Sequence, residues 1–285
     1  MLESLISGLV AGSAYALIAL CVVMLYRLVG LLNFSQAAIG ALGAFTTYGL
    51  ATLGAPLPVA VIAGLIASAI AAGLIGWMTA KWFGDSTVTA RSAMTVALLI
   101  LLLTVGFRLF GTSPQVIPSI VPVVTFEIGG VRVPLTTVVA LALTVVIAAS
   151  LSLILQRTDV GIRMLAMSER PTTVQLLGVN SRLLAVVVWT VTGLIAALSV
   201  LLVAPTQNPT FDTVSLLIVP GLAAALVGGF TKVWVAVASG LVIGAIEGVG
   251  AQFGPLADVR GAVPFIVIIV ALIWLRRKAV WDAVR

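Results

Sequence analysis

Apolar residues dominate the chain and form runs that charged and turn-forming residues separate. The runs lie at 5–26, 31–52, 57–80, 92–110, 135–156, 183–204, 214–230, 232–252 and 261–276. An α-helix needs about 20 apolar residues to cross a membrane, and the runs at 214–230 and 261–276 are short. The pattern predicts an all-α integral membrane protein, a single polytopic bundle over residues 1–285 of about eight or nine transmembrane helices.

Composition narrows the function classes. The chain is 61% hydrophobic and 8% charged, whereas soluble domains carry about 25% charged residues. Histidine is absent and Cys21 is the only cysteine, so haem, iron–sulfur and zinc sites would lack their usual ligands. We expect no cofactor, no metal and no catalytic residue. In a chain this apolar, the net charge of +6 does not indicate nucleic-acid binding. We expect the positions of the basic residues to indicate which loops face the cytoplasm.

Lysine and arginine predict the orientation, because cytoplasmic loops of membrane proteins are enriched in them. If the N-terminus lies outside and every run crosses once, the outside holds only Arg108, Arg132 and Arg260. The inside then holds the other twelve, which are Arg27, Lys81, Arg91, Arg157, Arg163, Arg170, Arg182, Lys232, Arg276, Arg277, Lys278 and Arg285. We therefore expect N-out and C-in, with nine crossings, or seven if two runs are re-entrant.

Two long connections have distinct patterns. In the outer one, 111–134, the stretch at 124–133 alternates around Gly129-Gly130, which predicts a small periplasmic β-hairpin. In the inner one, 157–182, the stretch SERPTTVQLLG predicts a short helix with Pro171 in its first turn and Gly178 past its end. Such a helix could rest on the membrane face or dock into a groove on a cytoplasmic partner, and spacing alone leaves both open.

Small residues recur every four positions within several runs. Two such series are Ser4-Gly8-Gly12-Ala16 and Ala236-Gly240-Gly244-Gly248. Small residues on one face of a helix let two helix backbones approach closely in lipid. We expect helix packing at Gly8, Gly12, Gly240, Gly244 and Gly248, within the molecule in preference to contacts between subunits.

Polar residues interrupt the second run at RLVGLLNFSQ. Asn33 suits a helix N-cap with Gln36 three residues later, which predicts a broken or re-entrant helix near 28–45. Non-helical backbone in the apolar layer must face protein or a water-filled cavity, and transporters use broken helices to bind carboxylates. Asn33, Ser35 and Gln36 therefore cap a helix, or line a substrate path, or do both.

Glu247 is a second polar outlier. It follows Lys232 by fifteen residues, or about 22 Å along a helix, in the outer third of the membrane. An acid at that depth is a candidate for the substrate path. It also suits a structural role, solvated near the outer interface or hydrogen-bonded to a neighbouring helix.

Three segments carry a family resemblance. The stretch at 158–205 begins TDVGIRMLAMSERPTTVQLLGV, the stretch at 8–45 contains NFSQA, and the stretch at 222–253 contains LVGGFTK followed by GLVIGAIEG. In this order they resemble the permeases of branched-chain amino acid ABC transporters. The resemblance implies an importer of leucine, isoleucine, valine or related amino acids in the bacterial inner membrane, with urea, short amides and aromatic acids as alternatives.

The resemblance also implies partners. It implies a coupling helix that docks on an ATPase, carried by Glu169, Arg170, Pro171, Thr172, Gln175, Leu176 and Gly178. The sequence contains no G-x-x-x-x-G-K-[ST] phosphate loop, so two separate ATPase subunits must hydrolyse ATP. A second related permease subunit and a periplasmic or lipid-anchored binding protein complete the expected assembly. The alternative is a stand-alone secondary transporter or channel, against which the scarcity of intramembrane acids counts.

Overall fold

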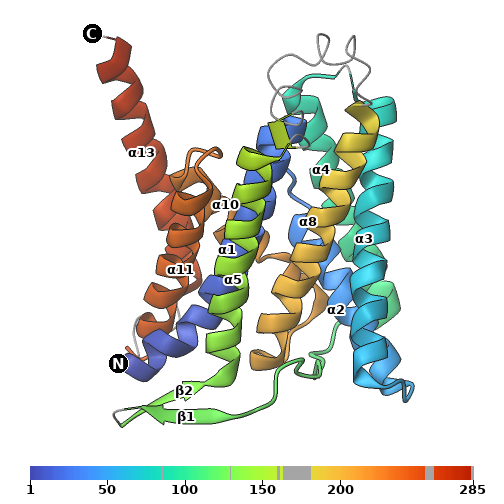
Figure 1. The fold of residues 1–285 in the computed structure, drawn as a ribbon, viewed down its shortest axis with the longest axis vertical. Coiled ribbons are helices and arrows are strands. Elements are labelled where there is room, and N and C mark those ends of the chain that lie inside the picture. The colour runs from blue at the N-terminus through green and yellow to red at the C-terminus, as the bar shows by residue number, and fades with distance from the viewer. Residues whose placement is uncertain (85, 129, 159–160, 163–180, 254–259, 284–285) are drawn as a thin grey trace.

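The computed structural model describes residues 1–84, 86–128, 130–158, 161–162, 181–253 and 260–283. The first half contains α1 (Leu2–Val29), α2 (Gln36–Thr52), α3 (Leu57–Trp82), α4 (Val88–Phe110), β1 (Thr125–Ile128), β2 (Val131–Pro134) and α5 (Leu135–Arg157). The second half contains α8 (Ser181–Val203), η1 (Ala204–Thr206), α9 (Phe211–Ser215), α10 (Ile218–Val227), α11 (Val233–Gly250), η2 (Arg260–Ala262) and α13 (Val263–Ala283). Figure 1 shows the helices side by side in one bundle.

Six described helices are long and apolar enough to cross a membrane, namely α1, α3, α4, α5, α8 and α11. Lipid offers no partner for backbone amides and carbonyls, so a spanning segment must satisfy them within the helix. The protein is therefore a multi-pass helical membrane protein, as the hydrophobic pattern predicts. α2, α9 with α10, and the apolar part of α13 are shorter, so the total number of crossings remains a prediction.

Helix α1 forms the centre of the bundle. In its most apolar window 89% of the residues are buried, compared with 11% in α4. α1 packs against α11, α8, α10 and α5, while α8 also packs against α3 and α2. The outer helices α3, α4 and α5 present exposed aliphatic side chains to the surroundings, as expected where the solvent is lipid.

Two segments of the bundle are interrupted. α1 ends at Gly30, which has a φ of 71° and donates its amide to the carbonyls of Leu25 and Tyr26, a glycine-ended helix terminus. Residues 30–35, called here the α1–α2 turn, lead back into the bundle before α2 begins at Gln36. The short run at 214–230, for which a tilted or broken helix is one expectation, lies in two helices, α9 and α10, separated at residues 216–217.

The two strands pair at one end of the bundle. Antiparallel pairing joins Ile128 to Val131, so two residues connect β1 to β2. The backbone amide of Arg132 donates to the Glu3 carboxylate at 3.3 Å, which ties the strands to the start of α1. Figure 1 shows the N-terminus and the strands at one end of the molecule and the C-terminus at the other.

Candidate functional site

The α1–α2 turn buries the polar residues that the sequence singles out. Asn33, Ser35 and Gln36, called here the polar cluster, have no exposed surface. The side-chain amide of Asn33 donates to the Gln36 side-chain oxygen at 2.7 Å. The backbone amide and hydroxyl of Ser35 both donate to Asn33 Oδ1, at 3.0 and 2.7 Å. The three side chains thus form one hydrogen-bonded network, as buried polar groups require.

The prediction that Asn33 caps the helix is wrong, because α2 starts two residues later than that prediction requires. α2 begins at Gln36 with Ser35 at the cap position, and no side chain bonds to the first amides of the helix. Asn33 instead accepts from a residue two positions on, a local turn that asparagine often forms. Gln36 is the first helical residue and contacts the Asn33 side chain rather than its backbone.

One bond from the polar cluster reaches another helix. Gln36 Nε2 donates to the carbonyl oxygen of Thr192 in α8 at 2.8 Å. The Cys21 thiol of α1 contacts the same carbonyl at 3.4 Å. The turn therefore joins α2 to α8 next to the central helix.

Side chains from α4 satisfy the non-helical backbone of the turn. Thr95 accepts from the amide of Phe34 at 3.1 Å, and its hydroxyl proton lies within reach of two carbonyls, that of Leu32 at 3.0 Å and that of Ser92 in its own helix at 2.7 Å. Ser92 accepts from the Leu32 amide at 3.2 Å. Unpaired buried backbone groups are costly, and these hydroxyls supply partners for the backbone of Leu32 and Phe34.

Arg91 completes the contact between α4 and the turn. Its guanidinium donates to the carbonyl of Val29 at 2.9 Å, one of the last carbonyls of α1, where a cation is favoured by the helix dipole. Sequence reasoning did not single out Arg91, Ser92 or Thr95. Their spacing on one side of an apolar helix is a signal that could have indicated them.

Glu247 lies half-buried in α11. The Tyr15 hydroxyl of α1 donates to its carboxylate at 2.6 Å. Glu247 is far along the chain from the polar cluster, and the structure assigns it a contact with α1. This hydrogen bond to a neighbouring helix is one of the structural roles that the sequence allows for Glu247.

The two glycine series meet where α1 crosses α11. A Cβ added at Gly240 would lie 2.7 Å from Ala16 Cα, and one added at Gly8 would lie 2.8 Å from Gly248 Cα. Gly12 faces Leu241 and Gly240, and Gly244 faces Gly12. Backbone thus packs directly on backbone within one molecule, the close approach that small residues allow in lipid.

The expected coupling helix lies outside the described residues. Glu169, Arg170, Pro171, Thr172, Gln175, Leu176 and Gly178 all belong to the segment 163–180. Their docking role therefore stays a prediction. Among the described residues no group of three or more histidine, cysteine or acidic side chains comes together.

Interrupted helices with buried polar groups at the breaks are typical of membrane transport proteins. The solved structure "PsaBC from Streptococcus pneumoniae in complex with Fab" shares the fold, with a TM-score of 0.51, 13% sequence identity, and coverage of 94% of this chain and 89% of that one.

The family follows from the sequence. Residues 4–272 match the family described as "Branched-chain amino acid transport system / permease component", and the chain belongs to this family. The "High-affinity branched-chain amino acid transport system permease protein BraD" of Pseudomonas aeruginosa is 24% identical over an alignment of 291 residues. The alignment covers 96% of this chain and 93% of that protein. The resemblance that the motifs indicate is confirmed: the protein is a permease component of ABC-type transport.

Proposed function

We propose that the protein is the membrane-spanning subunit of an ATP-driven importer of branched-chain amino acids. The observation that carries this proposal is the family match over residues 4–272, supported by a relative named for branched-chain amino acid transport that matches almost end to end. The bacterial inner membrane is the location that this family implies.

The proposed orientation places the N-terminus outside and the C-terminus inside. It rests on the excess of lysine and arginine in the loops that would lie inside, and the two ends of the chain lie at opposite ends of the bundle (Figure 1). In this orientation the strands β1 and β2 face the periplasm. The end of α1, the start of α11 and the segment 157–182 face the cytoplasm.

The energy for transport comes from other polypeptides in this proposal. The sequence lacks a phosphate-binding loop, so two ATPase subunits hydrolyse ATP and act on the permease through the segment 157–182. A second, related permease subunit completes the translocation path. A periplasmic or lipid-anchored protein delivers the amino acid to the outer face.

The polar cluster is the proposed substrate path. It is fully buried here, so substrate reaches it only after the surrounding helices move. The Gln36–Thr192 hydrogen bond joins α2 to α8, so relative movement of these helices exchanges that bond for contacts with the amino acid. Glu247 is a second candidate along the path, nearer the outer face.

Asn33→Ala tests the proposed path. It removes the donor to Gln36 and the acceptor for Ser35, and we expect reduced amino acid uptake by a complex that still assembles. Uptake is measured in whole cells and the amount of assembled complex by affinity purification. Normal assembly together with normal uptake would show that the polar cluster serves only the start of α2.

Affinity purification from the native membrane tests the assembly. We expect an ATPase and a second permease to accompany the chain, and both ATPase recovery and uptake to fall when residues 169–175 are scrambled. Alanine at the exposed residues Thr112, Ser113 and Val123, on the proposed periplasmic side, is the control and should leave the ATPase bound. A chain that purifies alone and moves solute in liposomes without ATP would instead be a secondary transporter.

A further inference from the structure

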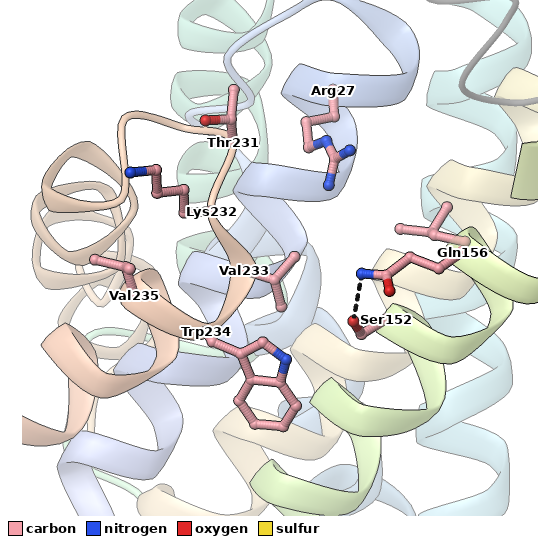
Figure 2. Close-up of a pocket in the computed structure, with 9 residues that line it drawn as sticks. Arg27, Ser152, Gln156, Thr231, Lys232, Val233, Trp234 and Val235 are labelled. Carbon is pink, nitrogen blue, oxygen red and sulfur yellow. Dashed lines mark hydrogen bonds between the residues drawn. The ribbon is translucent and has the colours of Figure 1, made fainter.

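A pocket opens at the end of the bundle where α1 ends and α11 begins; it is called here the polar pocket after the polar side chains that line it together with a larger apolar surface. Its volume is about 230 Å³, and its polar lining comes from Arg27 of α1, Ser152 and Gln156 of α5, and Thr231 and Lys232 before α11. Figure 2 shows Arg27 extending toward the space beside Val233, with Gln156 and Ser152 on one side and Thr231 and Lys232 on the other, where the Lys232 ammonium points away from Arg27. Residues from three separate segments therefore line the pocket, with one cation, Arg27, turned into it and a second, Lys232, at its rim.

The charges of this pocket have no counterpart in the described part of the chain. Neither Arg27 nor Lys232 forms an ion pair or a side-chain hydrogen bond with another described residue. The backbone amides of residues 233–235, which also line the pocket, donate to no acceptor among the described residues. Three free amides at a helix start favour an anion, and here they add to two cationic side chains.

An apolar groove adjoins the pocket. It has a volume of about 470 Å³ and runs along α11 from Trp234 to Ile246, with Val227 of α10 and Val267 of α13 beside it. Trp234 and Val235 line both the groove and the polar pocket. The groove extends for about 18 Å along the helix, at 1.5 Å per residue.

We propose that the pocket and groove together bind one anionic phospholipid. The phosphate lies beside Arg27 at the start of α11, the Lys232 side chain at the rim turns toward it on binding, and one acyl chain follows the groove along α11. Basic pockets between membrane helices are known sites for anionic lipid head groups, and tryptophan is enriched at the depth where head group meets hydrocarbon. Trp234 is 48% exposed and stands between the two halves, as such a site requires. A soluble phosphate would use the cations but leave the groove empty.

Lipid retention measures the charged half of the site. The complex is purified in detergent, delipidated, and incubated with equal amounts of dioleoyl phosphatidylglycerol and dioleoyl phosphatidylcholine, and native mass spectrometry counts the lipids that remain bound. We expect preferential retention of phosphatidylglycerol. Arg27→Gln and Lys232→Gln should each weaken it about fivefold, since one basic residue near an anionic surface contributes about 1 kcal/mol, while Lys232→Arg should retain it.

Lys81→Gln is the matched control. Lys81 is an exposed lysine beside two tryptophans, with its ammonium 4.7 Å from the Trp77 ring, but it does not line the pocket. Its substitution should leave lipid retention unchanged. Equal retention of the two lipids, or equal losses for Lys81→Gln and Lys232→Gln in complexes that elute as intact assemblies, would overturn the proposal.

The groove separates a lipid from a soluble phosphate. Ala238 is an exposed groove residue, and Ala238→Phe should fill the groove and weaken phosphatidylglycerol retention severalfold. Glycerol 3-phosphate, titrated over the same concentrations, should bind far more weakly and should not respond to this change. Binding of glycerol 3-phosphate as tight as that of the lipid, unaffected by Ala238→Phe, would assign the cations to a soluble anion and overturn the lipid site.

Discussion

Gly244→Ala is the sharpest test of how α1 and α11 pack. An added Cβ would lie closer than 3.0 Å to the amide nitrogen and Cα of Gly12 and to the carbonyl oxygen of Gly8. All three are backbone atoms, so no side chain can rotate away to make room. The helices must separate, and because α1 is the central helix the separation disturbs its other contacts as well.

The size of the effect follows from two opposing contributions. Overpacking a close-packed interior typically costs about 1–3 kcal/mol. Replacing a glycine within a helix by alanine returns up to about 1 kcal/mol of helix propensity. Because three backbone atoms resist the new methyl group, we expect overpacking at the upper end of its range. The net loss in the free energy of unfolding is then about 2 kcal/mol.

The assay is reversible unfolding of the purified chain in mixed detergent micelles, followed by tryptophan fluorescence. Gly250→Ala is the matched control, since Gly250 ends the same helix and a Cβ there would meet nothing within 4 Å. It should be neutral or slightly stabilising. If Gly244→Ala is as stable as Gly250→Ala, the backbone contact between α1 and α11 does not exist as described.

Three further predictions concern the hydrogen bonds of buried residues, each measured by the same unfolding assay. Gln36→Ala leaves the Asn33 amide without its acceptor and should cost about 1–3 kcal/mol. Thr95→Val removes bonds to two backbone groups of the turn and should cost a similar amount. Thr104→Val, at an exposed position of the same helix, is the control and should change stability little. Equal effects of the two threonine variants would refute the role of α4. Tyr15→Phe should cost about 1 kcal/mol or more by removing the donor to the Glu247 carboxylate, and an unchanged unfolding free energy would contradict that contact.

Much of the architecture could be predicted from the sequence because lipid imposes a simple rule. A spanning helix must be apolar over its whole length, so the charges and turn residues between runs mark most helix ends. The glycine series could be identified in the same way, since four-residue spacing places small residues on one face of a helix. Which helix each series contacts was not predictable, because that contact joins residues more than 200 positions apart, such as Gly12 and Gly244.

The details of the candidate site were harder to predict. The motif NFSQ indicated a broken helix, but the sequence could not show whether Asn33 bonds to helix amides or to its neighbours, since backbone torsions decide this. Thr95 and Arg91 support the turn from about 60 residues away, a contact that only the fold creates. The break between α9 and α10 falls at two leucines, which favour a continuous helix, and its sequence signal is Pro220, which cannot donate a hydrogen bond to the carbonyl of Leu216 and suits the first turn of a new helix.

Amino acid uptake by the reconstituted complex tests the central claim most directly. The complex purified from its native membrane is placed in liposomes, with labelled leucine and its binding protein on one side and ATP on the other. The proposed function predicts leucine uptake that requires ATP and is lost when residues 169–175 are scrambled. Leucine uptake that proceeds without ATP through this chain alone, driven by an ion gradient, would contradict it.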